Sequence, residues 1–161
     1  MKVSTFYKLS TFVLVVLIAY VSAWMRAYSL SDGYFTYAEQ QYSTGNLVLA
    51  LKGMNKQSLR KGDDYFGGYQ QVIEAWHSST LGPRPEAYYH SLEKPKQIIE
   101  QLSVEELLEF IDVYVQLDSR YVPVAADQVR VLAKQAGDAG LYNDMTAFLT
   151  EAFPRYKQQE I

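Results

Sequence analysis

A run of 17 residues without a charged side chain, from Leu9 to Met25, restricts the fold of this chain more than any other feature of its sequence. Lys8 and Arg26 flank the run, and the preceding Phe6-Tyr7 pair extends it. At a rise of about 1.5 Å per residue, about 18 to 20 helical residues cross a hydrocarbon core of about 30 Å. The sequence therefore predicts a transmembrane helix. The residues expected to anchor it in lipid are Leu9, Phe12, Val13, Leu14, Val15, Val16, Leu17, Ile18, Tyr20 and Trp24.

The basic residues on the two sides of this segment predict its orientation. Lys2, Lys8 and the terminal amine precede it, whereas only Arg26 follows it closely. Because the more basic flank of a transmembrane helix stays in the cytoplasm, we expect a bacterial inner (cell) membrane protein with a cytoplasmic N-terminus. The bulk of the chain is then periplasmic or extracytoplasmic. Trp24 and Tyr28 fall at the outer interface, where aromatic side chains are enriched.

Two other interpretations of the segment are open from the sequence alone. Val21 and Ala23 have the spacing that a signal peptidase recognises, so the first 23 residues are alternatively a signal peptide cleaved after Ala23. The apolar region is longer than the roughly 7 to 15 apolar residues that are usual in a signal peptide, which favours a retained helix. The third interpretation is a core helix of a soluble domain. It requires apolar neighbours on every side, which a chain of 161 residues struggles to provide.

The distribution of charge excludes one class of partner. Three of the 15 basic residues lie in the first 30 positions, where there is no acidic residue, and all 18 acidic residues lie further along the chain. The part that follows the apolar segment is therefore acidic, and its basic residues are scattered. Because a nucleic-acid-binding protein needs a basic surface for the phosphates, we expect no nucleic-acid partner.

Residues suited to catalysis or to metal binding are few. The chain has no cysteine, which excludes disulfides, thiolate nucleophiles, zinc–cysteine sites and iron–sulfur clusters. His77 and His90 are the only histidines, and no metal-binding motif surrounds them, so a small metal or haem protein is a distant alternative. Glu105, Glu106 and Glu109 follow helical spacing and are explained as a solvated face. We therefore expect no enzyme activity and no cofactor.

The remainder of the chain reads as all-α, because apolar residues recur at helical spacing and no stretch alternates as a strand does. Turn and capping residues set the expected bounds, the clearest being the capping box Ser103-Val-Glu-Glu106. The expected helices run from Ser31 or Asp32 to Tyr42, from Leu47 to about Asn55, from Tyr65 to His77, from Pro85 with an interruption or restart at Pro95, from Val104 to beyond Val115, from Val124 to Ala136 and from Leu141 to Phe153.

The expected organisation has one membrane segment and one domain. Residues 1–26 form the transmembrane anchor, and residues 27–32 form a short neck. Residues 33–154 form a small antiparallel helical domain with an exposed loop at 56–64, the most polar stretch of the chain. Residues 155–161 are expected to be a mobile tail, as chain termini usually are.

Two segments of this domain, 34–57 and 129–154, share a spacing of small residues. A small residue is followed seven positions later by glycine and five positions later by a small or medium-sized residue. The matching residues are Ala38, Gly45 and Ala50 in the first segment and Ala133, Gly140 and Met145 in the second. The spacing, with Pro154 ending the second segment, resembles the helix-turn-helix unit of tetratricopeptide repeats. The resemblance implies a protein-interaction scaffold in which each glycine reverses the chain.

Tyrosine is the unusual residue of the composition, with 14 copies. Aromatic side chains bring a large area and a polar tip to an interface, although many also line the core of a small bundle. The YFGGY and EAYYH stretches are the candidates for partner contact, and we expect the two glycines to permit close approach of another chain or of the membrane surface. The candidate interface residues are Tyr65, Phe66, Gly67, Gly68, Tyr69, Tyr88 and Tyr89.

These observations favour a non-catalytic, single-pass accessory subunit. Its anchor is expected to pack against integral membrane subunits of a larger complex within the lipid bilayer, with respiratory or photosynthetic electron-transport complexes as one natural host. The alternative is a membrane-anchored, tetratricopeptide-like adaptor for envelope assembly. It predicts a concave groove that binds peptides.

Overall fold

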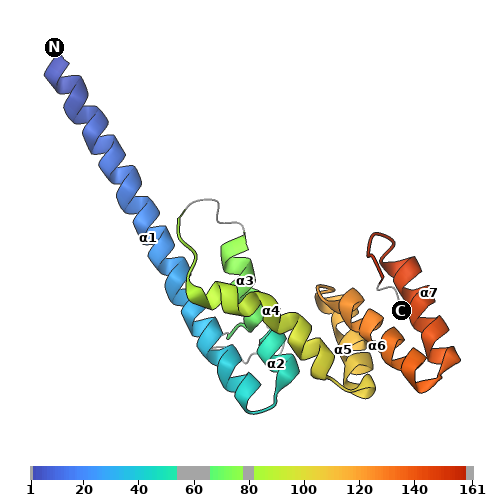
Figure 1. The fold of residues 1–161 in the computed structure, drawn as a ribbon. Helices are drawn as coiled ribbons and strands as arrows, with labels where there is room; N and C mark the ends of the chain where they lie inside the picture. Colours follow the sequence, from blue (N-terminus) through green and yellow to red (C-terminus); the bar gives the residue numbers. More distant parts are fainter. Residues whose placement is uncertain (1, 54–65, 78–81, 159–161) are drawn as a thin grey trace. The chain divides into compact units, whose positions relative to one another are not determined.

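The computed structural model describes residues 2–53, 66–77 and 82–158, with side chains from residue 7 onward. Every regular element in these ranges is an α-helix, as the sequence predicts (Figure 1). The helices are α1 (Lys2–Ser43), α2 (Leu47–Lys52), α3 (Tyr69–His77), α4 (Glu86–Gln101), α5 (Val104–Leu117), α6 (Val122–Ala136) and α7 (Ala139–Ala152). The expected loop at 56–64 and part of the expected ends of α2 and α3 lie outside the described residues.

The helices belong to two compact units, residues 1–92 and 93–161, here called the N-terminal and C-terminal units. The boundary at residue 92 lies inside α4 and divides the stretch that the sequence analysis treated as one domain, 33–154.

A single uninterrupted helix of 42 residues, α1, forms the first half of the N-terminal unit. The predicted neck at 27–32, and the predicted start of a new helix at Ser31 or Asp32, are therefore wrong. Ser31 does not cap a helix, because its hydroxyl donates to the carbonyl oxygen of Tyr28, one turn back, at 3.0 Å. Gly33 weakens a helix by only about 1 kcal/mol relative to alanine, and the packing of this half of α1 on α2 and α3 outweighs that cost.

The core of the N-terminal unit lies where the second half of α1 meets α2 and α3. Gly45, with φ of +82°, reverses the chain between α1 and α2. Its positive φ is a conformation that glycine adopts at no steric cost. The side chains that are almost completely buried here include Ala38, Ala50, Leu51, Tyr69, Val72 and Trp76.

Helix α4 runs from Glu86 to Gln101 with Pro95 inside it, so the predicted interruption at Pro95 is wrong. A proline in a helix removes one backbone hydrogen bond and does not by itself end the helix if packing holds both sides. Ile98 and Ile99, one turn beyond the proline, are buried and supply such packing.

The C-terminal unit contains the second half of α4, then α5, α6 and α7, with α6 in contact with both α5 and α7. The capping box that begins α5 is confirmed: Ser103 N–H donates to Glu106 Oε2 at 2.8 Å, and Glu106 N–H donates to Ser103 Oγ at 3.3 Å. The donation from Ser103 N–H, and a second donation from the Ser103 hydroxyl to the same Glu106 Oε2 at 2.8 Å, also lower the pKa of Glu106 below its ordinary value. Helices α6 and α7 begin two residues before their predicted starts.

The described residues do not confirm a tetratricopeptide-like arrangement. Gly140 lies inside α7, whereas Gly137, with φ of +74°, occupies the left-handed position that ends α6. Gly45 therefore corresponds in conformation to Gly137. The spacing that carried the resemblance aligned Gly45 with Gly140 instead, so the expectation that Gly140 reverses the chain is wrong. Sequence spacing could not separate the two glycines, because both lie within four positions of the turn.

The chain after α7 folds back on its own unit. Tyr156 N–H donates to the carbonyl oxygen of Phe153 at 2.9 Å, and the Tyr156 hydroxyl donates to Asp127 Oδ2 at 3.2 Å. Tyr156, which the sequence places in the expected tail, therefore contacts α6. Residues 159–161 lie outside the described part of the chain.

Candidate functional site

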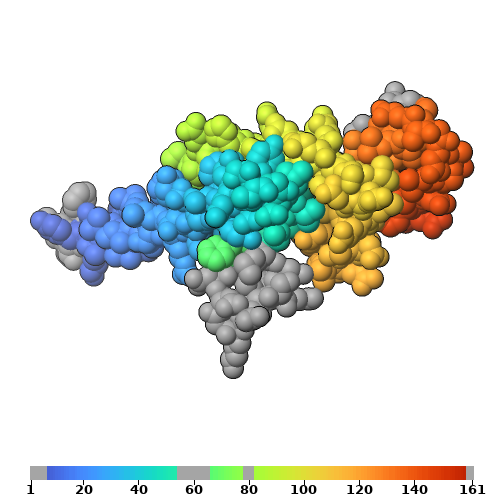
Figure 2. Space-filling view, turned by 90° about the horizontal axis from the view of Figure 1, so that it is seen from below, coloured from blue at the N-terminus to red at the C-terminus, as the bar shows by residue number. Residues whose placement is uncertain are grey.

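The first half of α1 exposes apolar side chains on every face. The large apolar residues from Leu9 to Ile18 keep between 50% and 66% of their surface exposed. Seven of them, from Phe12 to Ile18, are consecutive and therefore cover about two helical turns all round. Figure 2 shows this part of α1, in dark blue, projecting from the rest of the N-terminal unit. The chain thus has a helix long and apolar enough to cross a membrane.

Two of the ten predicted anchor residues have a second role. The Tyr20 hydroxyl lies against Gly82, and Trp24 is half-buried. The other eight, Leu9 and the seven residues from Phe12 to Ile18, are exposed as a lipid anchor requires. Tyr20 and Trp24 are therefore residues of the apolar run that also contact the 82–83 segment.

A short loop contacts the helix at these two residues. The backbone of Gly82, with φ of +96°, lies directly against the Tyr20 hydroxyl, so a side chain there would be strained and would require Tyr20 to move. Trp24 Nε1–H donates to the carbonyl oxygen of Pro83 at 3.1 Å. The loop at 82–83 is thereby fixed to one face of α1, where Figure 1 shows the chain passing beside the helix.

Aromatic rings extend this contact into the core. The Trp24 ring stacks on Tyr28 with 5.5 Å between ring centroids, and it meets Trp76 edge-on at 6.1 Å. Arg84 follows the loop, with its guanidinium 4.7 Å from the centre of the Tyr88 ring and Nη1 donating to the Tyr88 hydroxyl at 3.0 Å. Trp24 is therefore in contact both with Pro83 and with the buried Trp76 of the N-terminal core. We call Tyr20, Trp24, Tyr28, Gly82 and Pro83 the collar.

The predicted partner interface is mostly core. Tyr69 and Tyr88 are buried, as are Gly67 and Gly68, so none of the four is available to a partner. Tyr65 lies outside the described residues. Phe66 and Tyr89 remain, with 40% and 57% of their surface exposed. Sequence alone did not separate these two from the others, because aromatic residues serve cores and interfaces equally well.

The two glycines of YFGGY permit a close approach within the chain instead of with a partner. A Cβ atom on Gly68 would lie 2.7 Å from Gly53 N, and one on Gly53 would lie 2.6 Å from the Phe66 carbonyl oxygen. The residues before α3 thus run against the end of α2, backbone to backbone. The expectation that Gly67 and Gly68 admit another chain or the membrane surface is corrected accordingly.

Tyr69 begins α3 and is the polar centre of the N-terminal core. Its hydroxyl donates to Glu39 Oε1 on α1 at 2.6 Å, and Phe35 and Tyr42 meet its ring edge-on. Burial, followed by the contact with Glu39, raises the pKa of Tyr69 well above its ordinary value. The side chain is therefore a neutral structural donor at physiological pH.

The histidines do not assemble a metal site in the part of the chain that is described. His77 is exposed at the end of α3, and His90 is exposed on α4 with Nε2 3.4 Å from Glu86 Oε1. No group of three or more His, Cys, Asp or Glu side chains among the described residues could hold a metal ion.

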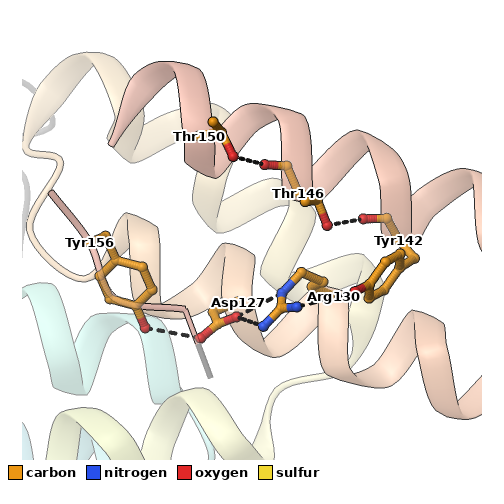
Figure 3. Close-up of polar contacts among 6 residues, drawn as sticks. All are labelled: Asp127, Arg130, Tyr142, Thr146, Thr150 and Tyr156. Atoms are coloured by element: carbon orange, nitrogen blue, oxygen red, sulfur yellow. Dashed lines mark hydrogen bonds and ion pairs between the residues drawn. The ribbon is translucent and has the colours of Figure 1, made fainter. Parts of the chain in front are cut away.

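A buried ion pair that the sequence did not predict lies in the C-terminal unit (Figure 3). Asp127 is 0% exposed and Arg130 is 4% exposed, both on α6. Arg130 Nε and Nη2 both donate to Asp127 Oδ1, at 2.9 and 2.8 Å. The signal was an acid and a base three positions apart on a helix face whose neighbours Ala126, Val129 and Ala133 are apolar.

Two tyrosines complete this cluster, one from α7 and one from the chain that follows it. Arg130 Nη1 donates to the Tyr142 hydroxyl at 3.4 Å, and the Tyr156 hydroxyl donates to the second carboxylate oxygen of Asp127. Burial by itself would lower the pKa of Arg130, but the hydrogen bonds to Asp127 and Tyr142 raise it. Both carboxylate oxygens are thus satisfied, and the cluster ties α6, α7 and the C-terminal segment together.

The Tyr156 contact should make the stability of the C-terminal unit depend on pH in the alkaline range. Burial and the adjacent Asp127 carboxylate raise the pKa of Tyr156 from 10 to about 12. The unfolded chain therefore loses this proton at lower pH than the folded chain, so the contact stabilises below pH 10 and is lost as pH rises towards 12. In thermal denaturation of the full chain in mild detergent, the stability advantage of wild type over Tyr156→Phe should shrink across this interval. A constant difference would show that Tyr156 does not contact Asp127.

A pocket of about 300 Å³ lies at the turn between α6 and α7. Asp138, in its wall, caps α7 by accepting a hydrogen bond from Leu141 N–H at 3.0 Å. The walls are completed by Lys134, Gly137, Ala139 and Tyr142. The Asp138 carboxylate in the pocket wall therefore serves as the N-terminal cap of α7.

Comparison of the chain with protein-family models, with curated proteins and with solved structures finds no match.

Proposed function

We propose that the chain is a single-pass membrane protein that serves as a non-catalytic accessory or structural subunit of a larger bacterial membrane protein complex. The observation that carries the proposal is the exposure of apolar side chains on every face of α1 from Phe12 to Ile18. A soluble protein rarely leaves so large an apolar surface in water. In lipid the same helix is stable, because its backbone hydrogen bonds are internal and its side chains match the acyl chains.

The proposed location is the inner membrane, with the N-terminus in the cytoplasm and the helical units on the periplasmic or extracytoplasmic side. Lys2 and Lys8 before the apolar stretch, against Arg26 after it, support this orientation. The contact between Tyr20 of α1 and Gly82 lies towards the C-terminal end of the uncharged run. The packed part of the N-terminal unit is thus on the side of the membrane to which α1 emerges.

The collar supports a retained anchor rather than a cleaved signal peptide. Val21, Ser22 and Ala23 lie in the middle of an uninterrupted helix. Tyr20 precedes them and contacts Gly82, and Trp24 follows them and bonds to Pro83. Cleavage after Ala23 would remove one half of this contact. A helix built into the packing of its own domain is better suited to permanent anchoring.

Integral membrane subunits are the proposed partners, and a respiratory or photosynthetic electron-transport complex is one such host. Phe66 and Tyr89 are exposed aromatic residues of the N-terminal unit. Phe66 stacks on Tyr37 of α1, with 5.3 Å between ring centroids, so it is presented in a fixed orientation. Pre-ordered aromatic side chains suit protein contact, because little conformational entropy is lost on binding.

The test is purification of the full-length chain from its native membranes in a mild detergent, followed by mass spectrometry. We expect stoichiometric multi-spanning subunits in the wild-type preparation and an intact mass that includes residues 1–23. The variant Tyr89→Ser should reduce the amount of copurified partner, whereas a matched change at an exposed lysine, Lys96→Ser, should not. A chain that purifies alone, or one that lacks its first 23 residues, would contradict the proposal.

A further inference from the structure

The loop at Gly82–Pro83 lies at a fixed height along α1. Gly82 touches the Tyr20 hydroxyl and Pro83 accepts the Trp24 indole hydrogen bond, so the loop is level with residues 20–24 of the helix. The uncharged run of α1 continues beyond that height, to Met25. The loop is therefore beside the last turn of the apolar stretch and not beyond it.

The length of α1 decides how this height relates to a membrane. From Lys2 to Tyr20 the helix rises about 27 Å, and from Lys8 to Arg26 it rises by the same amount, each close to the hydrocarbon thickness of about 30 Å. The first placement ends the hydrocarbon core at Tyr20, and the second ends it at Arg26. In both placements the loop lies at or within the outer boundary between acyl chains and headgroups.

The chemistry of the collar suits that boundary. The indole N–H of Trp24 is already satisfied by Pro83, and Pro83 has no backbone N–H of its own. A polar N–H group without a hydrogen-bond partner is costly in an apolar environment. Trp24 avoids this cost because its indole N–H is bonded, and Pro83 avoids it because it has no N–H. Tyr20 and Tyr28 are aromatic residues of the type that gathers at membrane interfaces. Arg26 is exposed just beyond Trp24, at a height where lipid phosphates accept hydrogen bonds.

We propose that the collar is a lipid-contacting surface, which seats the N-terminal unit directly on a phospholipid bilayer with Gly82 and Pro83 in the headgroup–acyl boundary. The inference depends on the proposed membrane anchorage and adds to it. A transmembrane anchor alone is compatible with a unit that is separated from the bilayer by water and a linker. The collar, in contrast, places the N-terminal unit in contact with the bilayer surface. The continuity of α1 from the apolar stretch into the core of the unit fixes that position.

The two tryptophans of the chain provide the test, because only Trp24 belongs to the collar. Trp76→Phe leaves Trp24 as the single emitter, and Trp24→Phe leaves the buried Trp76. Each full-length variant is reconstituted into phosphatidylcholine vesicles that carry bromine either near the glycerol backbone or near the methyl ends of the acyl chains. We expect Trp24 to lose most of its emission with the shallow bromines and much less with the deep ones. Trp76, which is almost completely buried behind Trp24, should lose less emission than Trp24 with the shallow bromines.

A second measurement covers the case in which a tryptophan variant does not fold. The chain has no cysteine, so Pro83→Cys carries a single nitroxide label, and Ser43→Cys at the far end of α1 is the matched control. Ser43 lies about 28 Å along the helix from Trp24. The label at position 83 should be more accessible to dissolved oxygen than to a water-soluble paramagnetic nickel complex. The label at position 43 should show the reverse.

The outcomes separate this inference from the anchorage on which it depends. If the chain resists carbonate extraction but Trp24 and position 83 respond as water-exposed sites, the collar does not touch lipid and only the inference fails. If the chain is released by carbonate, the proposed anchorage fails as well. Stronger quenching by deep bromines than by shallow ones also overturns the inference, because the collar would then lie inside the acyl region.

Discussion

Replacing Arg130 by leucine is expected to destabilise the C-terminal unit by about 3 to 5 kcal/mol, the usual cost of leaving a buried charge without its partner. Asp127 is completely buried, and Arg130 supplies two of the hydrogen bonds that satisfy it. Without the guanidinium, the carboxylate keeps only the Tyr156 hydroxyl among these contacts. Arg130→Leu therefore leaves a buried anion, which is more costly than the loss of the pair as a whole.

The measurement is chemical denaturation of the full-length chain in mild detergent, with hydrogen exchange used to follow α6. The double variant Asp127→Leu/Arg130→Leu should recover much of the loss, because apolar residues often replace a buried ion pair at little cost. Lys96→Leu breaks an exposed pair, Lys96 Nζ to Glu100 Oε1 at 3.7 Å, and is expected to cost less than about 1 kcal/mol. If Arg130→Leu cost no more than Lys96→Leu, the pair would not be buried in the protein.

Placing arginine at both Leu14 and Leu17 is expected to abolish membrane integration. Both residues lie near the middle of the apolar part of α1 and are more than half exposed. An arginine at the centre of a transmembrane helix costs about 2.5 to 3.5 kcal/mol relative to a neutral helix, and the leucine contribution is lost in addition. The two changes together therefore exceed what the remaining apolar residues supply.

Alkaline carbonate extraction of a membrane fraction gives the readout. Wild type should remain in the pellet and the double-arginine variant should move to the supernatant. Val113→Arg is the matched control, since Val113 is an exposed apolar residue on α5, away from the anchor. It should leave the chain in the pellet. If α1 were exposed to water, arginine would be favourable at Leu14 and Leu17, so an unchanged distribution with improved solubility would contradict the anchor.

Local sequence signals predicted the helices well where the signal and the structure both act over a few residues. The Ser103–Glu106 capping box forms as expected because its partners are three positions apart. The neck at 27–32 failed for the opposite reason. Ser31 is a good capping residue in isolation, but helix α1 continues past it because distant segments, α2 and α3, pack on its second half. Pro95 follows the same rule, with Ile98 and Ile99 buried beyond it.

The candidate site divides in the same way. The exposed apolar helix was predictable, because seventeen uncharged residues are a property of the sequence. The collar was not, since Trp24 and Pro83 are 59 positions apart and no local pattern pairs them. The division of the tyrosines also depended on packing: Tyr88 is buried and its neighbour Tyr89 is exposed. Composition indicates how many aromatic residues a chain has, whereas the fold decides which of them face outward.

By itself, the sequence determined the helical class of the chain, its long apolar segment and its capping box, because helix formation and apolar character depend on neighbouring residues. Only the tertiary structure decided that α1 runs without a break into the packed part of its unit. It also decided that Gly82 and Pro83 contact α1 at Tyr20 and Trp24. The burial of Asp127 and Arg130, and their hydrogen bonds to Tyr156 and Tyr142, were likewise decided by the fold. These features join residues far apart in the chain. Their free energy comes from desolvation and shape, which exist only once the segments have met.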